Sequence, residues 1–401
     1  MTLSRRTFLA TLTAALAAPA LAQTDFPMVT DDGFSHWLAK FRARAAKKGI
    51  SPATLDAAFA HAGFIPAVVE KDRSQFEFNL TLEDYLAITA SAERIKMGRA
   101  VMQRHGRLLK QIEQTYGVES HIIAAVWGIE SFYGTKRGVV PTISALATLA
   151  YDGRRAAFFE SQLIAALKIL QHGDVTPQNM TGGWAGAMGH TQFIPTTYAA
   201  YAVDFRGDGR RDIWSDDPTD ALASAANYLA KSGWSYGQPW GHEVQLPENF
   251  NRALAGNLRR RATADWANLG LRTATGGRLS DHGAGSVILP DRGGPAFLVF
   301  HNYTVITHYN AAQKYVIGLG HLSDRINGGP ALHTAFPPDE NGLRQTDRVE
   351  MQKRLTRMGY DCGSVDGVFG PMTRAAIRGF QTSRGLPVDG KASLDLLSLM
   401  R

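Results

Sequence analysis

One glutamate, Glu130, combines a titratable carboxyl group with a position on an apolar helix face. Four apolar residues just before it recur with the 3.6-residue period of an α-helix: Ile122, Ile123, Val126 and Trp127. Glu130 continues this stripe, and we expect the helix to end at Gly134 in the left-handed conformation. Burial and the negative end of the helix dipole would both raise the pKa of the carboxyl group. Glu130 is therefore a candidate general acid. The alternative is a glutamate that faces solvent at a helix end.

A glycine-rich segment, residues 181–195, contains side chains that suit a sugar ligand. Its glycines let the backbone come close to a ligand. Aromatic rings such as those of Trp184 and Phe193 stack on sugar faces, and the amide of Gln192 can bond hydroxyl groups. The segment favours a carbohydrate site, and a tight connection between two helices is the alternative.

An acidic loop, residues 204–212, partly matches a calcium loop. Such a loop needs oxygen ligands at its first, third and fifth places and glycine at the sixth. Asp204, Asp208 and Gly209 fit, but Arg206 takes the third place, and the twelfth is Ser215 rather than glutamate. The sequence therefore favours a structural turn. A cation held by the aspartates is the alternative, with three candidate ligands: Asp204, Asp208 and Asp212.

The first 22 residues have the features of a signal peptide. Arg5 and Arg6 precede Phe8 and Leu9, which resembles a twin-arginine export signal, and residues 20–22 form a small-x-small cleavage site. No cysteine stands at the cleavage point, which argues against a lipid anchor. We expect a soluble periplasmic protein without an integral membrane anchor, because no later apolar run is long enough to span a bilayer.

The charge balance favours an anionic partner. Removing Arg5 and Arg6 from the 43 basic residues leaves 41 against 36 acidic ones, a net charge of +5. No basic run with interleaved aromatic residues is present, so nucleic acid is not expected as a partner. The single cysteine, Cys362, excludes an intrachain disulfide and a cysteine zinc site.

The elements that must position these residues are mostly helices. Apolar periodicity predicts helices from residue 33 to 170 and again over 214–234, followed by short strands and turns over 241–299. The apolar run 297–305 favours a strand, and a helix is expected from about residue 307 to 326. A Pro/Gly-rich linker then precedes a compact basic module, residues 346–401.

Several motifs in order carry a family resemblance. WGIESFYG (127–134), GGWAGAMGHTQFIPTTY (182–198), the acidic loop and THYNAAQKY (307–315) resemble the lytic murein transglycosylase B family, glycoside hydrolase family 103. The resemblance covers roughly residues 33–328. Residues 346–401 resemble a peptidoglycan-binding module, with the pattern GxVDGxFGPxTxxAxxxFQ matched at 363–381.

The resemblance implies a mainly α (α+β) fold. Its parts would be a lysozyme-like helical catalytic domain with a small β-rich insertion and a small C-terminal three-helix peptidoglycan-binding domain. The boundaries implied are a signal peptide at 1–22, a catalytic domain at 23–328, a linker at 329–345 and the binding domain at 346–401. The partners would be peptidoglycan glycan strands and, still open, wall-remodelling proteins. No cofactor is expected beyond the structural cation that Arg206 puts in doubt.

The resemblance also implies an activity and its residues. The family cleaves the β-1,4 bond between N-acetylmuramic acid and N-acetylglucosamine without water and leaves a 1,6-anhydro ring. Glu130 would be the sole catalytic acid/base. The implied substrate-binding residues are Tyr85, Gly186, Ala187, Met188, Gln192, Tyr309, Asn310 and Tyr315. Where relatives often have a serine, this chain has Gly183, which leaves open which group orients the glutamate or the substrate and whether the rate is affected.

Two rival functions remain. A lysozyme-type muramidase on the same fold would use water and a second carboxylate, and no second motif carboxylate is evident. A non-catalytic wall-binding protein would rely on the C-terminal module alone. The presence of Glu130 together with Gln192, Tyr309 and Tyr315 argues against it.

Overall fold

The computed structural model describes residues 26–74, 80–257 and 259–401. The expected signal peptide at 1–22 lies outside the described residues. No helix in the described part of the chain is both long and apolar enough to cross a membrane.

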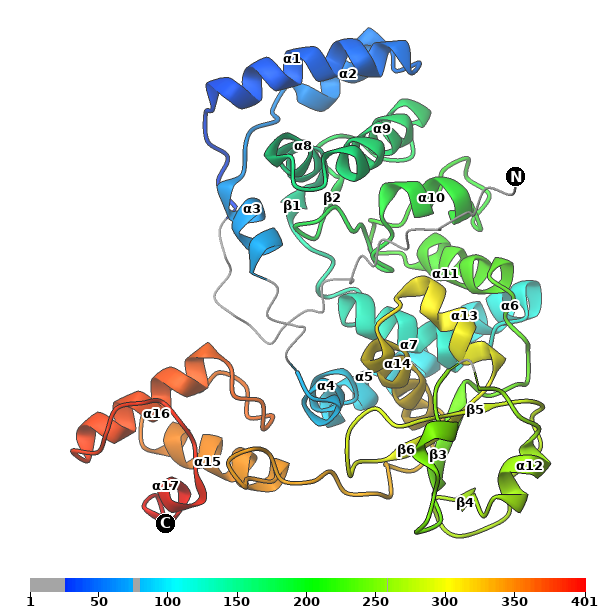
Figure 1. The fold of residues 1–401 in the computed structure, drawn as a ribbon. Coiled ribbons are helices and arrows are strands. Elements are labelled where there is room, and N and C mark those ends of the chain that lie inside the picture. Colours follow the sequence, from blue (N-terminus) through cyan, green and yellow to red (C-terminus); the bar gives the residue numbers. More distant parts are fainter. Residues whose placement is uncertain (1–25, 75–79, 258) are drawn as a thin grey trace, which may run out of the picture.

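The N-terminal helices form the upper part of the molecule in Figure 1. Two helices lie in the helical stretch expected from residue 33, because Ser51 caps the second one by accepting a hydrogen bond from the Thr54 amide at 3.2 Å. Pro52 starts that helix, where a missing N–H costs nothing. The helices of this part are α1 (Asp32–Lys47), α2 (Pro52–Phe59), α3 (Pro66–Arg73), α8 (Thr142–Asp152) and α9 (Ala156–His172).

The centre of the fold is α7 (Ser120–Ser131), the helix that carries Glu130. Nearly every residue of α7 is buried, so the helix lies inside the protein rather than along its surface. Four helices pack around it: α5 (Ala92–Arg104), α6 (Gly106–Tyr116), α11 (Thr219–Lys231) and α14 (Gln313–Ile326). The short helix α4 (Leu82–Thr89) packs on α14 from the other side.

The end of α7 differs from the sequence-based expectation. The helix ends at Ser131, and the left-handed conformation begins at Phe132 (φ 50°) and continues through Tyr133 (φ 57°) to Gly134 (φ 84°). Gly134 is left-handed as expected, but the helix has already ended at Ser131. Positive φ is uncommon in aromatic residues, so packing around these two rings must hold the turn.

The glycine-rich segment runs between two helices of the upper part. It starts in β2 (Thr181–Gly182), which pairs antiparallel with β1 (Val140–Pro141), and ends at α10 (Pro195–Tyr201). This pairing anchors the segment beside the residues that follow α7 in the chain.

A small antiparallel sheet forms the β-rich insertion. Its strands are β3 (Gly241–Gln245), β4 (Arg272–Thr273), β5 (Ser286–Ile288) and β6 (Ala296–Val299), in the order β4-β3-β6-β5. The sheet has its own apolar core around Trp266, with the 3-10 turn Arg252–Leu254 and α12 (Thr263–Asn268) beside it. The expected mainly α fold with a small β-rich insertion is confirmed.

The boundary between β6 and the next helix was predicted wrongly. The run 297–305 is not one strand, because β6 ends at Val299 and α13 (His301–Tyr309) starts two residues later. The Asn302 amide donates to the Ser235 and Gln238 carbonyls at 2.9 and 2.6 Å, which fixes the first turn of α13. This long-range contact overrides the strand preference of the apolar run.

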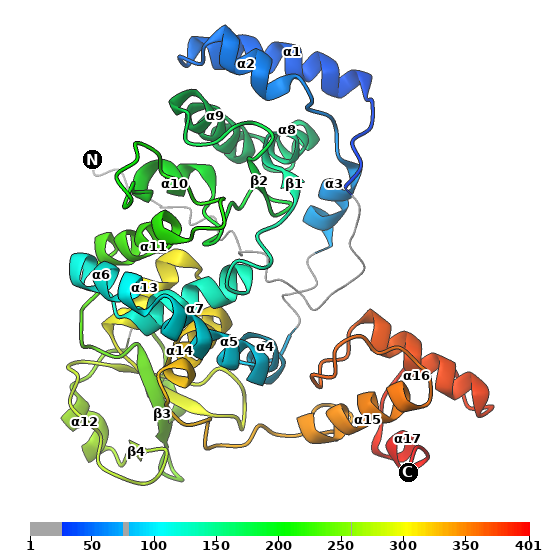
Figure 2. The same cartoon turned by 180° about the vertical axis from the view of Figure 1, so that it is seen from behind.

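The C-terminal part, drawn in orange and red in Figure 2, consists of three helices with a core of their own. They are α15 (Gln345–Arg357), α16 (Pro371–Ser383) and α17 (Leu394–Ser398), and the core includes Met351, Leu355, Ile377 and Phe380. Arg348 of α15 is buried and forms ion pairs with Glu83 (2.6 Å) and Asp84 (3.1 Å), both in the first turn of α4. Ion pairs between Arg348 and the first turn of α4 thus join the three-helix module to the helical body.

Candidate active site

Glu130 lies in the last turn of α7 with only 1% of its surface exposed. The reading that places this side chain in solvent is therefore excluded. One carboxylate oxygen, Oε1, accepts a short hydrogen bond from the Tyr315 hydroxyl, whereas the buried Oε2 has no partner among the described residues. Burial raises the pKa of Glu130 to about 8, against the opposing effects of the Tyr315 hydrogen bond and the positive charge of Arg94. The expected raised pKa is confirmed, and the side chain is mostly protonated at neutral pH.

Two tyrosines from the end of the domain stand beside Glu130. The rings of Tyr309 and Tyr315 are nearly parallel, with centroids 6.4 Å apart. The Tyr309 hydroxyl donates to the Thr191 carbonyl at 2.6 Å, which ties α13 to the glycine-rich segment. Burial and the nearby Glu130 raise the pKa of both tyrosines well above the usual value, so both stay protonated donors.

Arg94 is a buried cation next to the candidate acid, and no sequence pattern pointed to it. Only 2% of its surface is exposed, its guanidinium donates a short hydrogen bond to the Gly128 carbonyl, and it lies 4.7 Å from the centroid of the Phe132 ring. The Tyr133 hydroxyl in turn donates to the Arg94 carbonyl at 2.8 Å. These contacts hold both left-handed aromatic residues and place a positive charge at the carbonyl of Gly128, two residues before Glu130.

Ser131 and His190 fasten the end of α7 to the glycine-rich segment. The Ser131 hydroxyl donates to the His190 carbonyl at 2.6 Å and accepts from the Gly134 amide at 3.0 Å. The His190 ring accepts from the Trp127 indole N–H through Nδ1 (3.0 Å), so its Nε2 carries the proton that bonds the Ser215 carbonyl (2.7 Å). Burial lowers the pKa of His190 to about 4, which keeps this ring neutral. Sequence reasoning found neither residue in this role.

The glycine-rich residues expected to bind sugar are packed into a tight loop. Gly186 (φ 84°) lies against Leu146, where a Cβ would come within 2.5 Å of a leucine methyl. The Ala187 carbonyl accepts from the Gly183 amide at 2.8 Å, and Met188 exchanges both backbone hydrogen bonds with Phe193. Met188 is fully buried. These residues shape the loop through their backbone groups.

Gln192 presents an acceptor rather than a donor. Its Nε2 group donates to the Arg137 carbonyl (3.0 Å) and the Gly189 carbonyl (2.8 Å), which uses both of its hydrogens. Its Oε1 has no hydrogen-bond partner among the described residues and lies 3.4 Å from the position of a Cβ built on Gly183. The serine of relatives would therefore fit at position 183 and contact this oxygen.

Asn310 and Tyr85, two further residues expected to bind substrate, have different structural roles. Asn310 is buried, and its Oδ1 accepts from the Ala312 amide at 2.9 Å, which shapes the turn between α13 and α14. Tyr85 of α4 packs against Gly318, one turn after Tyr315 on α14, where any Cβ would clash with its ring at 2.6 Å. Its hydroxyl group influences the pKa of Tyr315 and of Arg94. The structure thus brings Tyr309 and Tyr315 to Glu130, and it brings Tyr85 close to Tyr315 and Arg94.

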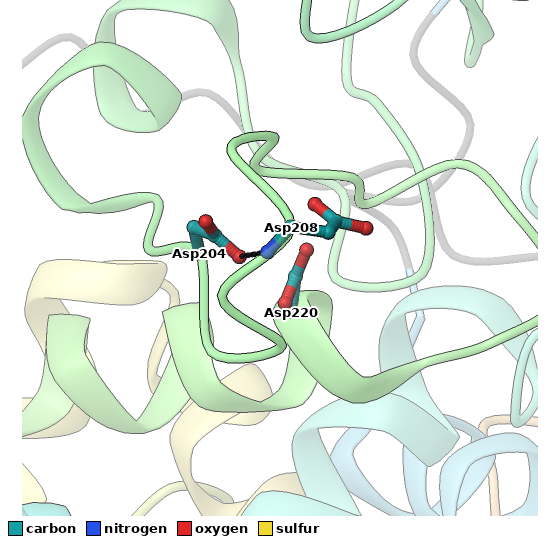
Figure 3. Close-up of side chains that lie close together, drawn as sticks. All are labelled: Asp204, Asp208 and Asp220. Carbon is teal, nitrogen blue, oxygen red and sulfur yellow. Dashed lines mark hydrogen bonds between the residues drawn. The ribbon is translucent and has the colours of Figure 1, made fainter.

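The acidic loop lies away from Glu130, between α10 and α11. Asp204, Asp208 and Asp220 each offer a carboxylate oxygen, and these oxygens lie within 4.8 Å of one another (Figure 3). Asp220, which opens α11, was missed by sequence reasoning because it stands outside the loop pattern. Asp212, a candidate from the sequence, does not belong to this cluster but pairs with Arg206.

Glu130 does not line either of two cavities that the described residues form. One of about 980 Å³ lies between α4, α5 and the C-terminal module, and Arg94, Phe132 and Lys136 form part of its wall. The other, about 880 Å³, lies beside the sheet. The first cavity therefore reaches residues beside the acid, whose own side chain is buried.

Two family models and a curated protein match this chain. The family model of the transglycosylase SLT domain matches residues 33–324, and a model of a peptidoglycan binding domain matches residues 344–400. Membrane-bound lytic murein transglycosylase B of Escherichia coli strain K12 is 31% identical over 242 residues, which are 58% of this chain and 64% of that protein. The chain therefore spans less than two thirds of the length of this curated relative.

Solved structures are similar over longer stretches. SltB3 of Pseudomonas aeruginosa, crystallised with NAG-NAM-pentapeptide and with NAG-anhNAM-pentapeptide, is 46% identical with a TM-score of 0.75. The match covers 92% of this chain and 100% of that one. Slt35 of Escherichia coli, crystallised with calcium, is 26% identical with a TM-score of 0.62 and covers 76% of this chain and 97% of its own.

Proposed function

This chain belongs to the transglycosylase SLT family, and from that premise we propose that it is a peptidoglycan lytic transglycosylase. The proposed reaction is non-hydrolytic cleavage of the β-1,4 bond between N-acetylmuramic acid and N-acetylglucosamine, leaving 1,6-anhydromuramic acid ends. The observation that carries this proposal is the enclosed Glu130, whose pKa is raised to about 8. The SltB3 complexes with NAG-NAM and NAG-anhNAM ligands support the same substrate and product for this chain.

One carboxylic acid is enough for this reaction. Glu130 would first donate its proton to the glycosidic oxygen as the bond from that oxygen to C1 breaks. The 2-acetamido oxygen of the substrate stabilises the positive C1, and the C6 hydroxyl then forms a new bond to C1. Glu130, now a carboxylate, takes the proton of that hydroxyl and is ready for another cycle. The Tyr315 hydrogen bond and the charge of Arg94 both favour the carboxylate form in the second half.

The surroundings of Glu130 disfavour a hydrolytic route. An inverting glycosidase needs a second carboxylate to activate water, and a retaining one needs a carboxylate nucleophile. The polar groups that act on the pKa of Glu130 are Tyr315 and Arg94, and neither is a carboxylate. Tyr85, Gln192, Tyr309 and Asn310 are proposed to hold the sugar so that its C6 hydroxyl faces C1, which raises the effective concentration of the nucleophile.

Digestion of purified sacculi in water enriched in heavy oxygen tests the reaction directly. We expect unlabelled ends that are lighter than hydrolysed ends by one water, about 18 Da, as the acid/base scheme requires. Label at the new ends would mean hydrolysis by a muramidase. Absence of any product would favour a non-catalytic wall-binding protein.

We further propose a division of labour along the chain. Residues 23–328 would hold the catalytic domain, with 329–345 as a linker and 346–401 as a wall-binding module that raises the local concentration of substrate. Export by the 1–22 signal would deliver the protein to the periplasm, where peptidoglycan lies. No cofactor takes part in the proposed reaction.

A further inference from the structure

The acidic loop between α10 and α11 lies in a cluster of carboxylate side chains. Five aspartates lie around it: Asp204, Asp208, Asp212, Asp217 and Asp220. Such a concentration of negative charge is unfavourable unless a cation compensates it. In a relative of the same fold, Slt35, the crystal contained calcium. In this chain, the compensating positive charge can come from a bound metal ion or from a basic side chain.

The carboxylates in the candidate metal cluster are already occupied by backbone donors. The two oxygens of Asp204 accept from the amides of Gly207 (2.6 Å), Asp208 (3.2 Å) and Gly209 (2.8 Å). Asp220 accepts from three further amides, those of Phe205, Arg206 and Asp212, at 2.9 to 3.1 Å. Calcium requires six to eight oxygen ligands, and three amide donors leave each of these two carboxylates with about one free acceptor position, so the loop lacks ligands unless another carboxylate is added.

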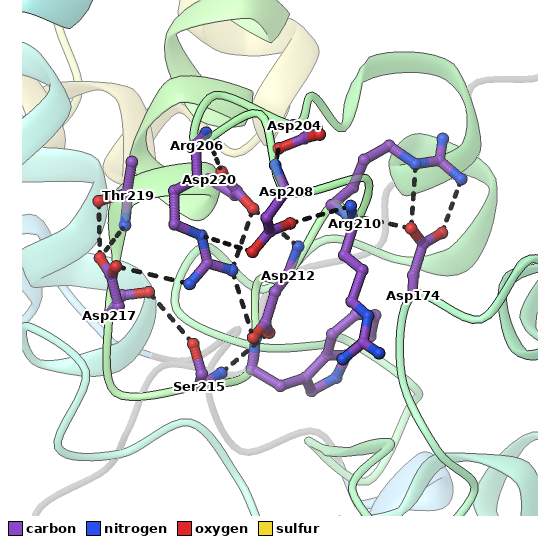
Figure 4. Close-up of polar contacts among 12 residues, drawn as sticks. Asp174, Asp204, Arg206, Asp208, Arg210, Asp212, Ser215, Asp217, Thr219 and Asp220 are labelled. Atoms are coloured by element: carbon purple, nitrogen blue, oxygen red, sulfur yellow. Dashed lines mark hydrogen bonds and ion pairs between the residues drawn. The ribbon is translucent and has the colours of Figure 1, made fainter.

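A side chain of the loop itself supplies positive charge at this place. The Arg206 guanidinium lies 3.3 Å from Asp220 and between 3.5 and 3.6 Å from Asp208, Asp212 and Asp217 (Figure 4). Arg206 occupies the third place of the loop, where a calcium loop has an oxygen ligand. A divalent ion bound among these carboxylates would meet a fixed positive charge in place of a ligand. The residues therefore do not fit calcium.

We propose that Arg206 is the resident cation of this loop and that it replaces a divalent metal ion. Its guanidinium offers five N–H donors in a planar arrangement, so one side chain can serve several carboxylates at once. Only 24% of this side chain is exposed, and its partner Asp220 is fully buried at the start of α11. Because α11 packs on α7, Arg206 also stabilises one wall of the helix bundle that holds Glu130.

Calcium binding and thermal unfolding of the full chain test this proposal. For the unaltered protein we expect no heat of calcium binding and the same melting temperature in EDTA as in millimolar calcium chloride. Arg206→Asp removes the guanidinium and places a ligand at the third loop position. We expect this variant to melt at a lower temperature in EDTA, to bind one calcium ion per chain, and to regain the lost melting temperature when calcium is added.

A matched control is Arg210→Asp. Arg210 is an exposed arginine of the same loop that forms no ion pair among the described residues, so the net charge changes equally while Arg206 stays. We expect this control to melt like the unaltered protein and to bind no calcium. Stoichiometric calcium binding by the unaltered protein would overturn the proposal. It would also fall if Arg206→Asp melts like the unaltered protein in EDTA, or if calcium does not restore a destabilised variant.

A variant that does not fold in EDTA still decides the question. Arg206→Asp can be refolded from denaturant with calcium, with magnesium or with neither. Recovery of native circular dichroism with calcium alone would support the replacement of a metal by Arg206. Equal failure in all three would show that the guanidinium has a role that no cation can fill, which contradicts the proposal.

Discussion

At the scale of single residues, two opposing influences act on the carboxyl group of Glu130. Burial favours the neutral acid, whereas the Tyr315 hydroxyl and the Arg94 charge favour the carboxylate. A group that must give up a proton and then take one back needs both states to be accessible near the working pH. The pKa of about 8 reflects this balance.

Glu130→Gln should remove activity and leave the fold intact. The amide has nearly the same shape and can still accept from Tyr315, but it cannot transfer a proton. We expect the rate of muropeptide release from sacculi to fall by at least about a hundredfold. A smaller loss would contradict acid/base catalysis by this residue.

The same variant should be more stable than the unaltered protein at neutral pH. The folded-state pKa of Glu130 is raised from 4.5 to about 8, so between these values the unfolded chain loses a proton that the folded chain keeps, and stability falls as pH rises. Glutamine does not titrate. Urea unfolding should show equal stabilities near pH 4 and an advantage for the glutamine variant at pH 7, on the order of 3 kcal/mol. Equal stabilities at both pH values would mean that Glu130 has an ordinary pKa.

Tyr315→Phe should change the pH dependence of the reaction as well as its rate. The Tyr315 hydroxyl lowers the pKa of Glu130 by bonding its Oε1, so its loss raises that pKa further. We expect a lower kcat and a descending alkaline limb of the pH–rate profile that moves to higher pH. The control is Tyr303→Phe, which removes the hydroxyl of a buried tyrosine in a different helix, α13. An alkaline limb that stays in place would exclude this role for Tyr315.

The sequence revealed some of these residues and not others. The burial of Glu130 followed from the apolar stripe, which α7 confirms. Arg94 looks like a surface arginine in a polar helix, because its role depends on contact with α7, 34 residues away. The left-handed Phe132 and Tyr133 also have no local signal, since only tertiary packing can hold aromatic residues in that conformation.

At the scale of elements, the junction between α7 and the glycine-rich segment positions the acid. Ser131→Ala removes the hydroxyl that bonds both the His190 carbonyl and the Gly134 amide. We expect the free energy of unfolding to fall by about 1–3 kcal/mol, because one buried and one partly buried backbone group lose their partner. Chemical denaturation measures this loss. Ser161→Ala, at an exposed serine of α9, should be close to neutral.

Element boundaries were the least predictable part of the fold. Helices with clear caps, such as α2 after Ser51, were expected from the sequence. The change from β6 to α13 was not, because β-branched and aromatic residues continue across it and the deciding contact, Asn302 with the 235–238 turn, is remote in sequence. Periodicity describes an isolated element, whereas its end depends on its neighbours.

At the scale of the whole molecule, the C-terminal module should govern encounter with the wall rather than chemistry. Its core is separate from that of the helical body. We expect deletion of residues 346–401 to weaken binding to sacculi and to leave turnover of short soluble glycans nearly unchanged, because tethering acts only on polymeric substrate. Pelleting with sacculi and product release from short glycans measure the two effects. Equal loss on both substrates would refute this division.

The tethered cation of the acidic loop has a consequence for the conditions in which the fold survives. A bound metal ion dissociates when its surroundings are diluted or when another chelator competes for it, so a metal-dependent loop reports on the composition of its solution. Arg206 is joined to its partners by the chain itself, and its effective concentration beside Asp220 does not change on dilution. We therefore expect the loop to keep its shape whether or not divalent ions are present. In exchange it has no means of sensing them.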